Sequence, residues 1–196
     1  MLIRPIEVRG AWTRGWTLDR HITSSVFLGY DEHGHPTFDS TRSPLGELVY
    51  QLKYRGQNDV EQIAEIMAGF FENKPNTLAR MELVVPMPPS TTRPAQPVAR
   101  VARAVAHKLS KTCSGSAVRK AKATPGLKDV HDPEERRELL NGAFEVDSDQ
   151  VRGKGVLLID DLYRSGATAN TVTMTLFAAG AARVYFLAAT RTRNRT

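Results

Sequence analysis

Residues 156–168 read Val-Leu-Leu-Ile-Asp-Asp-Leu-Tyr-Arg-Ser-Gly-Ala-Thr, and this stretch decides the fold. Its four leading apolar residues predict a strand buried on both faces, which is typical of a parallel sheet. Two adjacent carboxylates, Asp160 and Asp161, end the strand, and small and hydroxyl residues then open a helix. Because parallel α/β sheets bind ligands at the carboxyl ends of their strands, the stretch predicts a binding site.

Each part of this stretch suits a sugar phosphate. The two carboxylates can accept hydrogen bonds from the vicinal hydroxyls of a ribose. The backbone N–H groups of residues 165–168, the Ser165 and Thr168 hydroxyls and the positive end of the helix form a phosphate cradle, in which Gly166 permits close approach. The sequence therefore predicts a site for a ribose that carries a 5′-phosphate.

Acidic pairs at strand ends also occur in three other settings. A Walker-type ATPase needs G-x-x-x-x-G-K-[ST], which Gly153-Lys-Gly155 does not supply. A receiver domain places its acidic pair early in the chain, whereas only 28 residues follow Thr168 here. Solvated aspartates beside an ordinary turn would explain the pair alone, but the thirteen residues together argue against that interpretation.

The rest of the chain alternates predicted strands and helices. Apolar runs predict buried strands at 82–85, 156–159 and 184–187, and shorter strands at 117–118 and 143–146. Apolar residues spaced by three and four predict helices over 45–54, 60–71, 98–109 and 169–177, and caps predict a short one over 132–141. This alternation predicts an α/β fold with a parallel sheet flanked by helices.

The first 44 residues differ from the rest because they read as strand and turn. Two extended runs, 25–30 and 37–40, flank a turn that contains Gly34 and Pro36, so we expect a β-hairpin there. The predicted organisation is a β-rich appendage over residues 1–44 and one α/β domain over residues 45–196.

Composition limits the classes of function. The 196 residues include 27 Lys+Arg and 21 Asp+Glu, and the net charge of +6 favours anionic partners such as nucleotides, phosphates or nucleic acid. The single cysteine, Cys113, excludes disulfides within the chain and any cysteine-held zinc. Neither a membrane span nor a signal peptide is recognisable, so we expect a cytoplasmic protein without a membrane partner.

The stretch 156–168 resembles the 5-phosphoribosyl-1-diphosphate (PRPP) signature of type I phosphoribosyltransferases. Weaker blocks over roughly residues 45–190 resemble the ComF-like competence and amidophosphoribosyltransferase-related group. These blocks are Leu52-Lys-Tyr54 with Gly56, Val84–Pro88 with Arg93, Thr124 with Leu127, Arg137 with Asn141, and Gly142-Ala-Phe144. The chain departs from the group in lacking a four-cysteine zinc ribbon, in Tyr163-Arg164 where Thr-Thr is usual, and in Thr92–Gln96 where Arg-Gly-Phe-Asn-Gln is usual.

The resemblance implies a role for each matching residue. The ribose would bind to Asp160 and Asp161, and the 5′-phosphate to the loop of Tyr163, Arg164, Ser165, Gly166, Ala167 and Thr168. The diphosphate would meet Lys53 and a pyrophosphate loop of Met87, Pro88, Pro89 and Ser90. A flexible hood loop over residues 119–127 would close over PRPP, with Lys120, Lys122 and Thr124 as catalytic candidates. Mg²⁺ would be held mainly by PRPP, so no all-protein metal site is expected.

The resemblance also implies the reaction, which is transfer of the 5-phosphoribosyl group to a nitrogen nucleophile with release of pyrophosphate. The acceptor is not readable from the sequence, and no residue is recognisable as a general base. The alternative is a PRPP- or nucleotide-gated protein that binds single-stranded DNA without turnover, using Trp12, Trp16 and the arginines at both ends. A third hypothesis is that the hairpin serves a partner or a homodimer.

Overall fold

The central sheet has six strands in the order β1-β2-β10-β9-β5-β6. The computed structural model describes residues 1–55, 59–89, 96–122, 130 and 132–192. All neighbouring strands are parallel except the β1–β2 pair, which is antiparallel. The strands are β1 (Ile6–Glu7), β2 (Arg14–Arg20), β5 (Leu83–Pro86), β6 (Thr112–Cys113), β9 (Gly155–Tyr163) and β10 (Arg183–Arg191). The predicted α/β fold with a mostly parallel sheet is confirmed.

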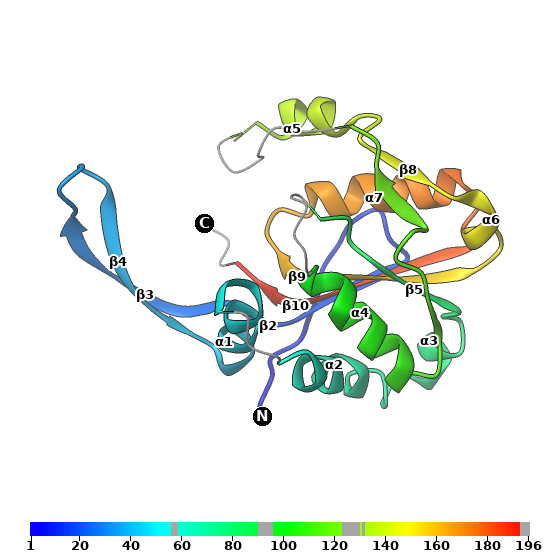
Figure 1. Cartoon of the computed structure of the whole chain (residues 1–196), viewed down its shortest axis with the longest axis horizontal. Coiled ribbons are helices and arrows are strands. Elements are labelled where there is room, and N and C mark those ends of the chain that lie inside the picture. The colour runs from blue at the N-terminus through cyan, green and yellow to red at the C-terminus, as the bar shows by residue number, and fades with distance from the viewer. Residues whose placement is uncertain (56–58, 90–95, 123–129, 131, 193–196) are drawn as a thin grey trace.

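Alternate side chains of β9 enter two separate hydrophobic cores, one on each face of the sheet. Leu157 and Ile159 pack with helices on one face, and Val156 and Leu158 pack with helices on the other. The first face is covered by α1 (Pro44–Tyr50), its π-helical continuation η1 (Gln51–Arg55), α2 (Val60–Gly69) and α4 (Pro97–Lys108). The second is covered by α7 (Ala167–Ala178) (Figure 1). A strand buried on both faces explains the continuous apolar run.

The helix predictions agree with the structure. The inward positions of residues 60–71 are Val60, Ile63, Ala64, Met67 and Phe71, and all five are buried. Two shorter helices, α3 (Pro75–Leu78) and α6 (Ser148–Val151), and α5 (Pro133–Leu140) complete the set. Among the described residues, no helix combines the length and apolar character that crossing a bilayer requires.

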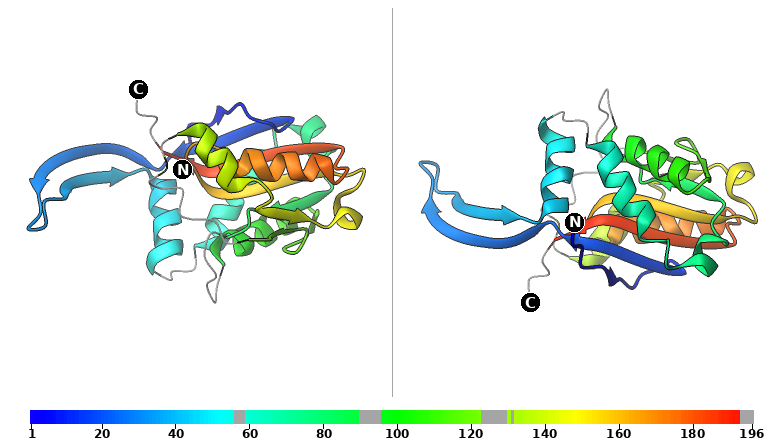
Figure 2. Two further views of the ribbon diagram at one scale, coloured as in Figure 1. Left: turned by 90° about the horizontal axis from the view of Figure 1, so that it is seen from above. Right: turned by 90° about the horizontal axis from the view of Figure 1, so that it is seen from below.

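The N-terminal strands extend the sheet across the expected boundary at residue 44. Strand β2 pairs in parallel with β10, with Trp16 opposite Leu187, and its Trp16 and Leu18 are buried. The hairpin of β3 (Ile22–Tyr30) and β4 (Pro36–Arg42) is the part that projects, as Figures 1 and 2 show. We call residues 22–42 the arm. The predicted hairpin is therefore present, while residues 6–20 belong to the sheet.

Two further features differ from the sequence analysis. The short strands β7 (Val118–Lys120) and β8 (Phe144–Val146) pair antiparallel with each other, outside the main sheet. Strand β7 contains the first two residues of the expected hood loop, Arg119 and Lys120, and an ion pair joins Arg119 to Glu145. The hood loop therefore starts later than predicted, and residues 123–127 lie outside the described part of the chain.

Candidate functional site

The acidic pair lies where β9 extends beyond its neighbour β5. Strand β5 pairs with β9 up to Pro86 opposite Ile159, and the N–H of Met87 then donates to the Ile159 carbonyl at 2.8 Å. The pairing of β9 with β10 continues to Tyr163 opposite Arg191. Asp160 and Asp161 therefore lie at the carboxyl edge of the sheet, beside the start of the predicted pyrophosphate loop.

Lys53 makes an ion pair with the second aspartate of the pair. Its Nζ lies 2.9 Å from Oδ2 and 3.1 Å from Oδ1 of Asp161, and both side chains are largely shielded from solvent. The lysine comes from η1, which follows α1 and packs Leu52 into the core. The structure thus brings together Lys53 and the acidic pair, which are 108 residues apart.

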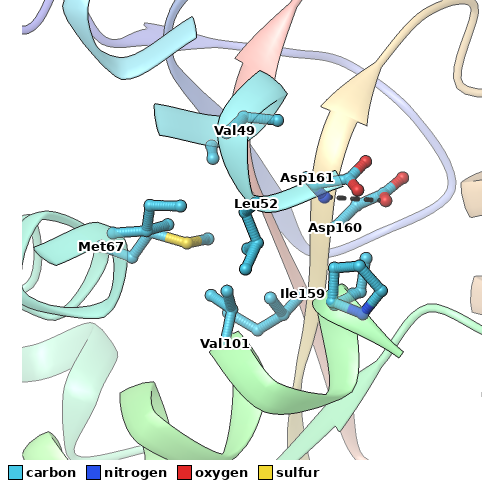
Figure 3. A pocket seen from close by; sticks show the side chains of 11 residues that line it. Val49, Leu52, Met67, Val101, Ile159, Asp160 and Asp161 are labelled. Carbon is cyan, nitrogen blue, oxygen red and sulfur yellow. Dashed lines mark hydrogen bonds between the residues drawn. The ribbon is translucent and has the colours of Figure 1, made fainter. Parts of the chain in front are cut away.

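The two carboxylates of the pair differ in their electrostatic state. Burial, and next the nearby Asp161 carboxylate, raise the pKa of Asp160 to about 8. The backbone N–H of Asp161 donates to Asp160 Oδ1 at 2.8 Å (Figure 3), and together with Lys53 it partly opposes that rise. Asp160 therefore keeps a proton at neutral pH, so the pair can both donate and accept hydrogen bonds.

The raised pKa of Asp160 predicts that the protein loses stability as pH rises. This carboxyl ionises near 3.9 in an unfolded chain but at about 8 when folded, so the folded state binds the extra proton. Its stabilising effect is complete below about pH 4 and is lost as pH rises through about 8. As pH rises from 5 to 8.5, the Tm of the wild type should therefore fall by at least about 3 °C relative to the Tm of Asp160→Asn, which lacks the titrating carboxyl.

Thermal unfolding of both proteins across that pH range measures this effect. Asp149→Asn is the matched control, because Asp149 is exposed on α6 and should follow the wild type. Parallel Tm curves for the wild type and Asp160→Asn would show that Asp160 ionises normally.

A small apolar cavity lies beside the carboxylates. Helices α1, α2 and α4 and strand β9 line it with Val49, Met67, Val101 and Ile159, and the acidic pair lies at its rim (Figure 3). Its volume of about 10 Å³ is close to that of one water molecule. A ribose does not fit in this space.

Gly166 forms the turn between the acidic strand and helix α7. Its φ of +78° lies in the left-handed region, and it is the N-cap residue of α7. A Cβ added here would lie 2.8 Å from the Tyr163 ring and hydroxyl. Glycine is therefore required both by the backbone and by the space, and the N-terminal N–H groups of a 12-residue helix are directed at the loop.

Gly166→Ala is expected to cost about 1–2 kcal/mol of unfolding free energy and to weaken phosphate binding, because the Cβ pushes Tyr163 away. Gly153→Ala is the matched control, since Gly153 has a φ of +74° and nothing within 4 Å of an added Cβ. Urea unfolding of both variants separates the clash from the shared backbone strain. Equal losses would contradict a role for the Gly166–Tyr163 contact.

The other residues of the phosphate loop fall into two groups. Ser165 and Arg164 are exposed, and Ser165 Oγ accepts a hydrogen bond from the Ala167 N–H at 3.5 Å. Tyr163 instead packs its ring against Trp12 and Phe186, with centroids 6.3 and 5.8 Å away. Burial raises the pKa of the Tyr163 phenol. The Tyr163 ring therefore packs against the core next to the loop, and the contact of Tyr163 with a phosphate stays a prediction.

The predicted diphosphate contacts are only partly described. Met87 is buried in the core, Pro89 is exposed at the start of its loop, and Ser90 lies outside the described residues. Lys120 lies on β7 and Lys122 is exposed just after it, while Thr124 lies outside the described residues. No group of three or more His, Cys, Asp or Glu side chains suited to a metal occurs in the described ranges.

A hydrogen-bonded chain that sequence reasoning missed connects His21 to the acidic strand. Thr190 Oγ1 donates to the Asp161 carbonyl at 3.0 Å, and His21 Nδ1 lies 3.2 Å from the same Oγ1. Since the hydroxyl hydrogen is used, Nδ1 is the donor to Thr190. Burial lowers the pKa of His21, as do Arg42 and Lys53. His21 directly follows β2 and Thr190 is the second-last residue of β10, so the contact is predictable only once β2 is recognised as a strand.

Thr190→Val tests this chain, because it removes the hydroxyl and keeps the buried shape. The free energy of unfolding should fall by about 1–2 kcal/mol, since both polar partners lose their bond. Thr190→Ser keeps the hydroxyl and should retain most of the stability. Urea unfolding of the two variants gives the comparison. Equal stability of Thr190→Val and Thr190→Ser would show that the hydrogen bonds of Thr190 do not stabilise the protein.

Comparisons with known proteins complete the description of this chain. No protein-family model matches the sequence, and no curated protein matches it. Solved structures do match. The adenine phosphoribosyltransferase of Thermoanaerobacter pseudethanolicus is 14% identical, with a TM-score of 0.45 over 86% of this chain and 94% of that one. A hypoxanthine phosphoribosyltransferase from Staphylococcus aureus is 14% identical, with a TM-score of 0.43 over 70% of this chain and 65% of that one.

Larger proteins match over one part of their length. Glutamine PRPP amidotransferase from B. subtilis is 17% identical, with a TM-score of 0.49 over 81% of this chain and 34% of that one. UMP synthase from Leishmania donovani is 14% identical, with a TM-score of 0.43 over 83% of this chain and 28% of that one. The chain thus spans about a third or less of these two proteins. The solved structures named here are phosphoribosyltransferases or larger enzymes of nucleotide synthesis, and the likeness at this identity concerns the fold.

Proposed function

We propose that this chain binds PRPP with Mg²⁺ at the carboxyl end of β9 and transfers its 5-phosphoribosyl group to a nitrogen nucleophile. One observation carries the proposal: a carboxylate pair and a glycine-capped helix N-terminus lie in the same short segment, residues 160–168. The vicinal hydroxyls and the 5′-phosphate lie at opposite ends of a ribose. The carboxylates suit the hydroxyls, and the helix N-terminus suits the phosphate.

The ion pair of Lys53 with Asp161 indicates how the site receives an anionic substrate. In the protein alone, Lys53 neutralises Asp161 at 2.9 Å. When PRPP binds, the ribose hydroxyls take over the hydrogen-bond acceptors of Asp161, and Lys53 becomes available to the negative diphosphate. After this exchange, Asp161 has the ribose hydroxyls as partners and Lys53 has the diphosphate, so neither buried charge is left without a partner.

Catalysis in this proposal is mainly electrostatic. The bond between the anomeric carbon and the diphosphate oxygen breaks, so positive charge develops on the sugar and negative charge on the leaving pyrophosphate. Lys120 at the end of β7, together with Lys122 and Thr124 after it, would stabilise the pyrophosphate, and the closed hood loop would exclude water. The nitrogen lone pair then forms the new bond, and the proton that the nitrogen loses passes to the departing pyrophosphate.

Magnesium fits this site only together with the substrate. The acidic pair offers carboxylate oxygens, which Mg²⁺ prefers, but Asp161 is already paired with Lys53 and Asp160 keeps a proton. Mg²⁺ bound to PRPP would neutralise charge on the diphosphate. We therefore assign no magnesium ligand to the side chains of the acidic pair.

The narrower assignment to the ComF-like group rests on the sequence blocks alone. The competing hypothesis of single-stranded DNA binding is no longer supported by the two tryptophans. Trp12 is 6% exposed and packs against Phe186, and Trp16 is 4% exposed and packs against Phe70 and Phe71. Buried rings are not available to stack on bases. The net charge of +6 is what still supports that hypothesis.

The experiment that tests the proposal is calorimetric titration with PRPP and Mg²⁺, followed by measurement of pyrophosphate release with a panel of nucleobases and simple amines. Ribose 5-phosphate and pyrophosphate, titrated separately, show which half of the ligand each part of the site binds. Saturable binding of Mg-PRPP with pyrophosphate release for one acceptor supports the proposal. Absence of Mg-PRPP binding to the folded protein would refute it.

A further inference from the structure

His21 lies near two parts of the site, the acidic end of β9 and the helix that carries Lys53. It directly follows β2 and precedes the arm, and its side chain is half-buried. Its backbone N–H donates to the Arg191 carbonyl at 2.8 Å, and its own carbonyl accepts from the Ser43 N–H at 3.3 Å. The proposed function gives this residue no role, although its contacts lead toward Asp161 on one side and toward Lys53 on the other.

On the strand side, the His21 ring acts through Thr190. The Thr190 side chain is fully buried, and its hydroxyl donates to the Asp161 carbonyl at 3.0 Å while it accepts from His21 Nδ1 at 3.2 Å. A hydroxyl has one hydrogen and can rotate, so a donor on its oxygen sets the direction in which that hydrogen points. Asp161 lies past Ile159, where the pairing of β9 with β5 ends. The contact with Thr190 thus holds the acidic end of β9 on the side of β10.

On the helix side, the His21 backbone fixes the start of α1. Ser43 is the N-cap residue of α1: its Oγ accepts from the Gly46 N–H at 2.9 Å, and its own N–H donates to the His21 carbonyl. A Cβ added to Gly46 would lie 2.2 Å from the His21 carbonyl oxygen, so the first turn of α1 is in close contact with His21. Helix α1 continues into η1, which carries Lys53.

The His21 ring has one N–H at neutral pH, and the contact with Thr190 uses it. Burial and two nearby cations lower the pKa of His21, and two nearby carboxylates partly oppose them; these charged groups are Arg42, Lys53, Asp161 and Glu47. The ring is therefore neutral at pH 7, with its hydrogen on either Nδ1 or Nε2. Because the Thr190 hydroxyl gives its only hydrogen to the Asp161 carbonyl, the His21 hydrogen is on Nδ1. A free histidine side chain favours the Nε2–H form, so the Nδ1–H form is a signature of this hydrogen bond.

We propose that His21 is a positioning residue of the PRPP site, which holds Asp161 through Thr190 and the helix of Lys53 through Ser43. The inference rests on the proposed function, in which this pair receives the ribose and the diphosphate. The ion pair joins Lys53 to Asp161 only in the protein alone, because PRPP takes over both partners. The hydrogen bonds of His21 then still link the acidic end of β9 to the start of α1.

His21→Leu and His21→Asn separate the hydrogen bond from the presence of the ring. The Asn side-chain amide can take the place of Nδ1–H and donate to Thr190, whereas Leu has the same branched shape without a donor. The Kd for Mg-PRPP should rise at least about 5-fold in His21→Leu and stay within about 2-fold of the wild type in His21→Asn. His107→Leu is the control, because His107 is exposed on α4, and it should bind as the wild type does. Calorimetric titration gives the affinities, and circular dichroism checks that each variant is folded.

Thr190→Val provides the second measurement, and it serves also if His21→Leu does not fold. It should weaken Mg-PRPP binding about as much as His21→Leu, because the ring acts through the Thr190 hydroxyl. The double variant His21→Leu/Thr190→Val should bind no more weakly than the weaker single variant. Unchanged affinity in Thr190→Val would overturn the proposal, and so would losses that add in the double variant.

Nitrogen-15 NMR of the imidazole rings tests the hydrogen bond without PRPP. The wild type should show the Nδ1–H form of His21, and Thr190→Val should convert it to the Nε2–H form; the signal is assigned by its loss in His21→Asn. The Nε2–H form in the wild type would overturn the positioning role. A wild type that binds no Mg-PRPP would refute the proposed function and this role with it, whereas equal binding by the wild type and His21→Leu would overturn the positioning role alone.

Discussion

Asp160→Asn/Asp161→Asn is expected to weaken Mg-PRPP binding by at least about 2 kcal/mol, which is about 30-fold. Both carboxyl groups lie at the carboxyl edge of the sheet, where the ribose hydroxyls would find the charged acceptor Asp161 and the protonated Asp160. The direction of the effect is informative, because removing the negative charge of Asp161 from a protein of net charge +6 should strengthen the binding of an anion. A loss of affinity must therefore come from local contacts.

Calorimetric titration of Mg-PRPP measures this loss. Asp39→Asn/Asp149→Asn is the control, because it makes the same two substitutions and removes at least as much negative charge at two exposed positions away from the site. This control should bind PRPP as tightly as the wild type or slightly better. Unchanged affinity in a folded Asp160→Asn/Asp161→Asn variant would remove the acidic pair from the site, and with it the main argument for PRPP.

The part of the site that was predictable from sequence is the part that is contiguous in the chain. A buried strand, its acidic end and a glycine-capped helix follow one another within residues 156–168, so local physics positions them all. Lys53 was included through the resemblance of its block to known proteins, and its distance of 2.9 Å from Asp161 shows where the fold brings it. Spacing alone gave no reason to pair two residues that far apart.

Strand β2 was missed because its interior is polar as well as apolar. Thr17 and Asp19 are buried, and a run of Arg-Gly-Trp-Thr-Leu-Asp-Arg does not read as a central strand. Thr17 has a hydrogen-bond partner that only the fold supplies, and Asp19 has one in the next residue. Arg191 Nη1 donates to Thr17 Oγ1 at 3.1 Å, and the Arg20 N–H donates to Asp19 Oδ1 at 2.8 Å.

Missing β2 also hid the role of the two tryptophans and of His21. Trp12 and Trp16 lie near arginines in the sequence, which suggested stacking on bases, but their rings fill the two cores. His21 follows directly after β2, and its partner Thr190 is 169 residues away. Neither contact has a local signature, since both depend on the parallel pairing of β2 with β10.

Lys120→Ala/Lys122→Ala is expected to lower the rate of pyrophosphate release at least about 100-fold, while the Kd for Mg-PRPP changes less than about 10-fold. The reason is that negative charge on the leaving pyrophosphate grows in the transition state, so cations that meet it there act on turnover more than on binding. Lys122 is exposed and Lys120 lies at the end of β7, directly before the hood loop. The proposed function places both lysines at the diphosphate when PRPP is bound.

Turnover and binding must be measured on the same preparations, with Lys111→Ala/Lys154→Ala as a control that removes equal charge from partly exposed positions elsewhere. If the lysine variant loses binding and turnover to the same extent, the two lysines hold PRPP and do not assist departure of pyrophosphate. If no acceptor supports turnover and the wild type binds single-stranded DNA, the log–log salt dependence should have a slope of about −0.7 per phosphate contact. PRPP-sensitive DNA binding of that kind would replace the enzyme with a nucleotide-gated binding protein, because a transferase needs the asymmetry between binding and turnover and a binding module does not.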